Sequence, residues 1–242
     1  MPNRFESLSD DEKAAICAEL DALYQKKPVA WKKWLKSRVA PDPMLWMHAT
    51  IHAFEQNPEF IHRWAVFQRL LTDPVTSAQH QAMWTAYLHH LAHNRRLKNS
   101  HTQWHIKKHF TLIPREYEQA VLDQALLGAS GPMTVPMLEH YYAVRCSTPA
   151  VFVQSLKHKS KKVRDAALQA AHRWPADADP ALIVALLKER KKDTRLYAAM
   201  ALANLPLDRI RTQREALQGF ADKEKVAAVS DALTGLIARI DG

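Results

Sequence analysis

The strongest constraint on this chain is an internal repeat with a period of 31 residues. Residues 149–175 align with residues 180–206, and ten of the 27 aligned positions hold the same amino acid in both copies. The identical pairs are Pro149/Pro180, Ala150/Ala181, Val153/Val184, Leu156/Leu187, Lys157/Lys188, Lys161/Lys192, Arg164/Arg195, Ala167/Ala198, Ala170/Ala201 and Pro175/Pro206. A fixed period of this length indicates a supersecondary unit that buries its apolar face by stacking on its neighbours.

Each copy is predicted to form two antiparallel helices. In the second copy Asp179 precedes Pro180, which is the pattern of an N-cap followed by proline in the first turn. We expect a first helix over residues 181–188 and a second helix capped by Asp193 that ends near Leu205. A third, more divergent copy is predicted to follow, with helices that contain Ala216, Leu217 and Phe220, and then Val226, Val229, Ala232, Leu233 and Leu236.

The scarcity of glycine excludes several folds and functions. The chain of 242 residues has five glycines, about 2% of the residues against a usual ~7%. Phosphate-binding loops, dinucleotide fingerprints and nucleophile elbows need clustered glycines, and tight hairpins need residues that accept positive φ. With 13 prolines as helix breaks, the sequence predicts an all-α protein.

The region before the repeat is also expected to be helical and is rich in aromatic residues. Ser9 and Glu12 have the spacing of a capping box, which marks the start of the first helix. Residues 128–132, Gly-Ala-Ser-Gly-Pro, are the strongest break in the chain. We therefore predict an N-terminal helical region over 1–127 and a repeat region over 128–242, with one continuous solenoid as the alternative.

The repeat resembles a known family of helical repeats. Its pattern Pro-Ala…Leu-Lys…Lys-x-x-Arg-x-x-Ala-x-x-Ala is similar to HEAT repeats of the short kind also found in phycobilin-lyase subunits. The resemblance implies a right-handed α-α superhelix that serves as a binding surface. It also implies a polar ladder between repeats that uses Asp193 and Arg195, with Arg164 at the equivalent place and Lys162 where the first copy would have the acid.

Charge and cysteine content indicate the class of protein and of partner. The net charge is +9, and the two cysteines, Cys17 and Cys146, have no metal-site or disulfide spacing. No run of 18 apolar residues and no signal-peptide pattern is present. We expect a soluble, cytoplasmic protein that does not bind membranes, with an anionic partner.

The first candidate binding surface lies on the two turns inside the repeats. These turns occupy equivalent positions, so stacking of the copies would place them side by side. The interpretation as a functional surface competes with that of solvated turns that aid solubility. The candidate residues are Lys157, Lys159, Lys161, Lys162, Lys188, Arg190, Lys191 and Lys192.

The second candidate surface lies in a stretch without acids. Residues 74–115 hold six Lys or Arg residues, seven histidines and no Asp or Glu. Cations interleaved with aromatic rings are what a nucleic-acid surface needs, although rings on helix faces more often pack in the core. The candidate residues are Arg95, Arg96, Lys107 and Lys108, beside the rings of Trp84, Trp104 and Phe110.

The histidines of this stretch raise the question of a metal site. His89 and His93 are four residues apart, as are His101, His105 and His109, so each set shares one face of a helix. No carboxylate occurs in the stretch to complete a ligand set. The expectation is therefore no metal and no cofactor, with metal binding by these histidines left open.

The function expected from the sequence is non-enzymatic binding through a basic solenoid surface. The partner is either an acidic protein surface or a nucleic acid, and these two alternatives stay open. Two other functions remain as alternatives. One is an alkylpurine DNA glycosylase of the HEAT-like type, for which no convincing catalytic carboxylate is found. The other is an inhibitor or immunity-type protein that neutralises another protein.

Overall fold

The computed structural model describes residues 4–23, 28–56, 62–72, 77–98, 100–174 and 178–242. These residues form helices joined by turns, and no strand occurs among them. The prediction of an all-α protein is therefore confirmed. No helix within the described ranges has the length and apolar character needed to cross a bilayer.

The chain divides into two compact units, Met1–Met137 and Leu138–Gly242. The helices up to the division are α1 (Asp10–Leu23), α2 (Pro28–Trp34), the π-helix η1 (Leu35–Val39), α3 (Pro43–Gln56), α4 (His62–Thr72), α5 (Ser77–His93), α6 (Ser100–Phe110), α7 (Glu118–Leu126) and α8 (Thr134–Ala143). The division falls inside α8. The helices after it are α9 (Pro149–Leu156), α10 (Lys161–Ala170), η2 (Ala171–Arg173), α11 (Ala181–Val184), η3 (Ala185–Lys188), α12 (Lys192–Ala203), α13 (Leu207–Ile210), η4 (Arg211–Gln213), α14 (Arg214–Ala221) and α15 (Ala227–Asp241).

Local sequence signals explain where several of these helices begin. The predicted capping box is present: Ser9 N–H donates to Glu12 at 2.8 Å, and Glu12 N–H donates to the Ser9 hydroxyl at 3.3 Å. Pro28, Pro43 and Pro149 are each the first residue of a helix. Proline is suited to that place because the N–H that it lacks would have no partner inside the helix.

The core of the first unit is built largely from aromatic side chains on α3, α4 and α5. The rings of Phe54 and Phe67 have centroids 5.8 Å apart, and Phe67 lies 4.7 Å from Tyr87. Trp46 and Trp84 are also buried. Because aromatic side chains remove large apolar areas from water, this cluster fixes α3 against α4 and α5.

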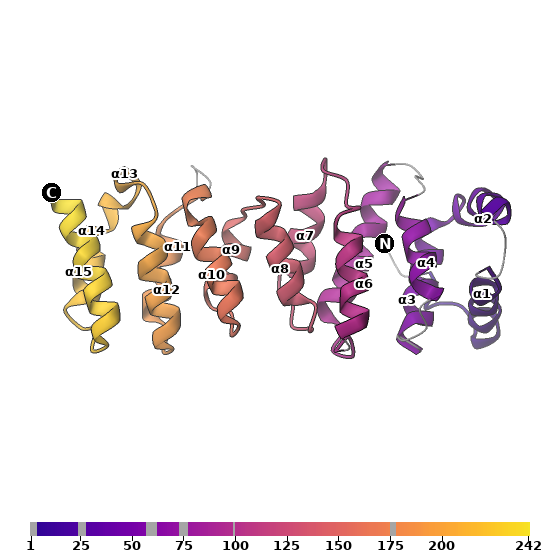
Figure 1. Cartoon of the computed structure of the whole chain (residues 1–242), viewed down its shortest axis with the longest axis horizontal. Coiled ribbons are helices and arrows are strands. Elements are labelled where there is room, and N and C mark those ends of the chain that lie inside the picture. The colour runs from indigo at the N-terminus through magenta and orange to yellow at the C-terminus, as the bar shows by residue number, and fades with distance from the viewer. Residues whose placement is uncertain (1–3, 24–27, 57–61, 73–76, 99, 175–177) are drawn as a thin grey trace. The chain divides into compact units, whose positions relative to one another are not determined.

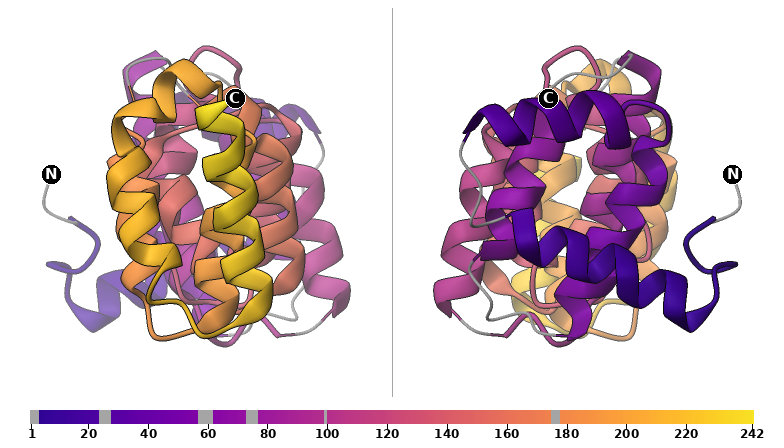
Figure 2. Two further views of the ribbon diagram at one scale, coloured as in Figure 1. Left: turned by 90° about the vertical axis from the view of Figure 1, so that its left-hand side faces the viewer. Right: turned by 90° about the vertical axis from the view of Figure 1, so that its right-hand side faces the viewer.

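The second unit consists of helix pairs packed against one another, as the repeat predicts. Helix α9 packs on α10, α11 and η3 pack on α12, and α14 packs on α15. Helix α12 contacts both α10 and α15, so the three pairs are neighbours (Figure 1). The left panel of Figure 2 shows α14 and α15 side by side. The turns within the pairs all lie at the lower edge of this unit in Figure 1.

Two details differ from the sequence-based expectations. Asp193 does not cap α12: Lys191 is the N-cap residue, without a side-chain cap bond, and Asp193 is the second residue of the helix. The Asp193 carboxylate instead faces Arg164 at 3.7 Å. Asp179 does accept a hydrogen bond from the Ala181 N–H at 2.9 Å. Pro175, which ends the first copy, lies outside the described residues.

The glycine-containing segment predicted as a break is bonded to the end of α5. The N–H of Gly131 donates to the Ala92 carbonyl at 2.7 Å, and the N–H of Ser130 donates to the same oxygen at 3.3 Å. A Cβ at position 131 would lie 2.7 Å from that oxygen, and Gly128 has a φ of +75°. A side chain would strain the backbone at position 128 and would collide with the Ala92 carbonyl at position 131.

Candidate functional site

A ladder of arginines joins the three helix pairs of the second unit. Arg195 Nη1 donates to the carbonyls of Glu189 and Arg190 at 2.9 and 3.0 Å, inside its own copy. Its Nε and Nη2 donate to the Glu224 carboxylate in the next copy, at 2.7 and 3.0 Å. The Arg195 guanidinium thus hydrogen-bonds both to the turn of its own helix pair and to a carboxylate of the following pair.

The same arrangement occurs one repeat earlier. Arg164 Nη1 donates to the carbonyls of His158 and Lys159 at 2.6 and 2.9 Å, and its Nη2 lies 3.7 Å from Asp193. Both arginines are therefore occupied by structural contacts. We call Arg164, Asp193, Arg195 and Glu224 the arginine ladder.

Ion pairs engage the two acids of the turn in the second copy. The turn of the second copy holds Glu189, which pairs with Lys157 of the first copy, and Asp193, which faces Arg164. The two ion pairs also hold the turns next to each other. The carboxylates that could neutralise these turns are therefore already engaged.

The remaining cations of the two turns form one exposed surface, here called the basic ridge. All of its side chains are exposed, and the structure records no ion pair for any of them among the described residues. The basic ridge consists of Lys159, Lys161, Lys162, Lys188, Arg190, Lys191 and Lys192. Lys157, the eighth predicted residue, is partly neutralised by Glu189.

The basic ridge ends at the third turn. Asp222, Lys223, Glu224 and Lys225 alternate in sign there, so that turn has no excess charge. His158 adds no charge to the ridge at neutral pH either. Burial and the neighbouring Lys159 and Arg164 lower its pKa.

The second predicted surface lies in the first unit. Arg95 and Arg96 are exposed in the connection between α5 and α6, and Lys107 and Lys108 are exposed on α6. Trp104 is 53% exposed, and Lys108 Nζ lies 3.5 Å from its ring centroid. Trp84 and Phe110, by contrast, are buried in the core.

Two histidines of the acid-free stretch have structural roles. His109 is buried, and its Nδ1 lies 2.7 Å from the Tyr87 hydroxyl. His80 lies between the Leu71 carbonyl and the Tyr117 hydroxyl, each at 2.6 Å. The side chains of His101 and His105 lie outside the described part of the structure.

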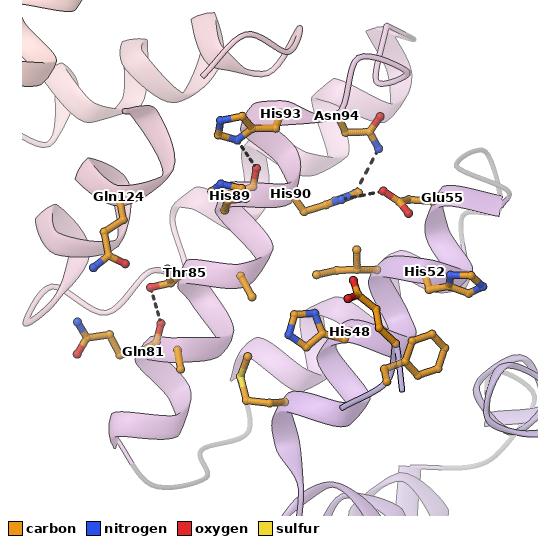
Figure 3. Close-up of a pocket in the computed structure, with 16 residues that line it drawn as sticks. His48, His52, Glu55, Gln81, Thr85, His89, His90, His93, Asn94 and Gln124 are labelled. Carbon is orange, nitrogen blue, oxygen red and sulfur yellow. Dashed lines mark hydrogen bonds and ion pairs between the residues drawn. The ribbon is translucent and has the colours of Figure 1, made fainter. Parts of the chain in front are cut away.

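The first unit also contains a pocket of about 890 Å³ between α3 and α5. Helix α3 contributes His48, His52 and Glu55, and α5 contributes His89, His90 and His93 (Figure 3). Carboxamides of Gln81, Asn94 and Gln124 lie around it, and Phe5 and Glu6 from the N-terminal segment complete one side. Five histidines thus share one pocket.

His90 is the most buried of these histidines and is held on both ring nitrogens. Its Nδ1 lies 3.5 Å from Glu55 Oε1, and Asn94 Nδ2 donates to its Nε2 at 3.3 Å (Figure 3). Because Nε2 accepts, the proton sits on Nδ1 and points toward the carboxylate. Burial, followed by the charge on His89, lowers the pKa of His90 to about 4 in spite of Glu55. The ring is therefore neutral at pH 7.

The imidazoles of His48 and His89 are also uncharged at neutral pH. Burial lowers the pKa of His48, opposed by Glu6, and burial together with His93 lowers the pKa of His89. The rings of His89 and His93 stack with centroids 4.1 Å apart, and His93 Nδ1 donates to the His89 carbonyl at 2.9 Å. Within the described residues no group of three His, Cys, Asp or Glu has the geometry of a metal site.

Several lining residues of the pocket were not singled out from the sequence. Glu6, His48, His52 and Glu55 lie outside the acid-free stretch, although His48, His52 and Glu55 share one face of α3 at helical spacing. That spacing is the one feature of the sequence from which a shared site on α3 could have been predicted. The meeting of this face with α5 depends on tertiary packing.

Comparison of the chain with protein-family models, curated proteins and solved structures found no match.

Proposed function

We propose that this protein is a non-enzymatic binding protein of the α-solenoid type, and that its basic ridge holds the phosphate backbone of a nucleic acid. The observation that carries the proposal is the engagement of Glu189 and Asp193 by Lys157 and Arg164. This pairing leaves seven exposed cations on two adjacent turns. A surface of that kind releases condensed counterions when it neutralises phosphates.

The composition of the basic ridge favours nucleic acid over an acidic protein. Protein interfaces have a centre of buried apolar or aromatic residues, whereas protein–DNA interfaces are more polar and more positive. The exposed large apolar side chains recorded in the second unit are Leu182 and Met200, and neither lies on the two turns. The ridge also lacks aromatic rings for base stacking, which favours a duplex over a single strand.

The proposal is tested with a fluorescently labelled DNA duplex of mixed sequence at 50 mM salt. The variant Lys161→Gln/Lys191→Gln should bind at least about tenfold more weakly than the unaltered protein, because two phosphate contacts are lost. Its matched control is Lys223→Gln/Lys225→Gln, which removes the same charge from the third turn and should bind nearly as well.

Two results would contradict this assignment. Equal losses of duplex affinity in the two variants would mean that the DNA responds to the net charge of the protein and not to the basic ridge. Absence of duplex binding at low salt, together with ridge-dependent binding of polyglutamate, would instead assign the ridge to an acidic protein.

A second candidate function is supported by the exposure of Trp104. An exposed indole with Lys107 and Lys108 on the same helix suits a single-stranded nucleic acid, whose bases stack on rings while cations meet phosphates. This surface belongs to the first unit.

A further inference from the structure

The pocket between α3 and α5 has a charge opposite to that of the chain as a whole. The chain has a net charge of +9. The described residues that line the pocket, however, include no Lys or Arg, and they do include two glutamates, Glu6 and Glu55. The histidines whose pKa values are lowered, His48, His89 and His90, add no positive charge at neutral pH. The pocket is therefore locally anionic.

The size and lining of the pocket suit a small organic molecule. Its volume of about 890 Å³ lies within the usual range for small-molecule sites, which is roughly 300–1,000 Å³. Apolar side chains such as Met44 and Ile51 alternate with polar ones. The stacked pair His89–His93, and Phe5 with its ring 5.2 Å from His52, present aromatic surface.

The pocket offers hydrogen-bond acceptors beside its carboxylates. The carboxamide oxygens of Gln81, Asn94 and Gln124 are among them. Glu55 meets His90 through Oε1, which leaves its second oxygen as a further acceptor. Glu55 is 47% exposed, so its carboxylate lies where the pocket meets solvent. A ligand with a protonated nitrogen at one end would match this arrangement.

Other ligand classes fit less well. Phosphates and carboxylates would meet the carboxylate of Glu55, and no Lys or Arg is among the described residues that line the pocket. A metal ion lacks a ligand set among the described residues. Aromatic rings beside acceptors, in contrast, favour organic cations through cation–π contact.

We propose that the pocket formed by His48, His52 and Glu55 of α3 and His89, His90 and His93 of α5 binds a small organic cation. The ligand is an ammonium or amidinium group on a flat apolar body. The charged group lies beside Glu55 and Glu6, and the apolar body lies along the imidazoles. This site is independent of the function proposed for the basic ridge.

The test uses three probes that share one ring and differ in charge: benzylammonium, benzyl alcohol and benzoate. Binding to the full chain is measured by calorimetry at pH 7.5 and 50 mM salt. Benzylammonium should bind most tightly and benzoate most weakly. Glu55→Gln and Glu6→Gln should each lower the affinity for benzylammonium by about fivefold and leave the affinity for benzyl alcohol unchanged.

Controls separate this site from general electrostatic attraction. Glu116→Gln removes an exposed carboxylate of the same unit that does not line the pocket, and it should leave all three affinities unchanged. Ala82→Phe places a ring in the pocket from an exposed position of α5 and should abolish binding of benzylammonium and benzyl alcohol. Lys161→Gln/Lys191→Gln should have no effect on these probes.

The proposal is overturned if benzoate binds as tightly as benzylammonium, if no probe binds, or if Glu55→Gln and Glu116→Gln have equal effects. Circular dichroism of each variant, which should match that of the unaltered chain, shows that a lost affinity is not a lost fold.

Discussion

Arg195 donates two hydrogen bonds to the carboxylate of Glu224, at 2.7 and 3.0 Å, and so joins the second and third helix pairs of the repeat. The two side chains are only 15% and 9% exposed. The arginine–carboxylate hydrogen bond holds the pKa of Glu224 below its usual value. This pair is therefore better protected from solvent than an ordinary surface ion pair.

Arg195→Ala should lower the free energy of unfolding by about 2 kcal/mol, because charged hydrogen bonds are lost and Glu224 is left buried without its partner. Urea denaturation measures the change. Arg214→Ala is the matched control, since Arg214 makes the same two-point contact with Asp241 at 2.9 and 2.7 Å but lies in solvent. It should change stability little. A similar loss in both variants would show that burial does not strengthen the ladder.

Stability should fall on acidification because of His90. Its pKa of about 4 in the folded protein lies below the ordinary ~6.5 of the unfolded chain, so the unfolded state binds the proton more readily. The folded protein is therefore favoured above the unfolded pKa, and stability is lost as the pH falls from about 6.5 toward 4. Between pH 7 and 5 this single group should cost about 2 kcal/mol.

The variant His90→Gln isolates the contribution of His90. Between pH 7 and 5 its free energy of unfolding should fall by about 2 kcal/mol less than that of the unaltered chain. Urea midpoints at pH 7, 6 and 5 provide the measurement. His172→Gln changes an exposed histidine and should follow the unaltered chain. Parallel curves for all three proteins would contradict the assignment.

The salt dependence of duplex binding should report the number of phosphate contacts. The slope of log affinity against log salt changes by about 0.9 for each phosphate neutralised. Lys161→Gln/Lys191→Gln should therefore flatten the slope by about 2, whereas Lys223→Gln/Lys225→Gln should leave it unchanged. An unchanged slope in the ridge variant would place the contacts elsewhere.

Single-stranded oligonucleotide should quench tryptophan fluorescence through Trp104. Among the tryptophans whose side chains the structure describes, Trp31, Trp34, Trp46, Trp84 and Trp174 are at most 7% exposed, and the side chain of Trp64 lies outside the described part. Quenching on addition of oligo-dT should therefore disappear in Trp104→Phe. Quenching that persists in this variant would exclude α6 as the contact.

Two glycines should respond in opposite directions to alanine. Gly235 lies inside α15 with no atom within 4 Å of a Cβ, so Gly235→Ala should raise the free energy of unfolding by about 0.5–1 kcal/mol. In Gly131→Ala the new Cβ would lie 2.7 Å from the Ala92 carbonyl oxygen. This substitution should therefore lower the free energy of unfolding by about 1–3 kcal/mol. Thermal denaturation of the two variants tests both signs.

The helices and the repeat could be predicted because their signals are local. The capping box at Ser9 and the periodic apolar residues of α12 depend on spacing along one helix. The arginine ladder could also be predicted from the sequence, because equivalent positions in stacked repeats lie next to each other. The prediction that Asp193 caps α12 was wrong. Its carboxylate faces Arg164 of the preceding copy instead, and the sequence does not show which of these two contacts prevails.

The histidine pocket could not be predicted because it joins residues of separate helices. His48 and His89 are far apart in the chain and meet only when α3 packs on α5. Glu55 lies outside the acid-free stretch in the sequence, but its carboxylate faces His90 of that stretch in the structure. Absence of acids in a segment therefore does not mean absence of acids around its side chains.

The direction of the arginine ladder gives a rule for how this array can lengthen. Each arginine reaches forward to the acid of the following copy, and the first copy has Lys162 where the second has Asp193. A duplicate of residues 180–210 inserted after position 210 would bring both an acid and an arginine, so every pair would be kept. A duplicate of residues 149–179 would set Arg164 against a lysine. Growth by gene duplication is thus compatible with the middle copy and is opposed by the first.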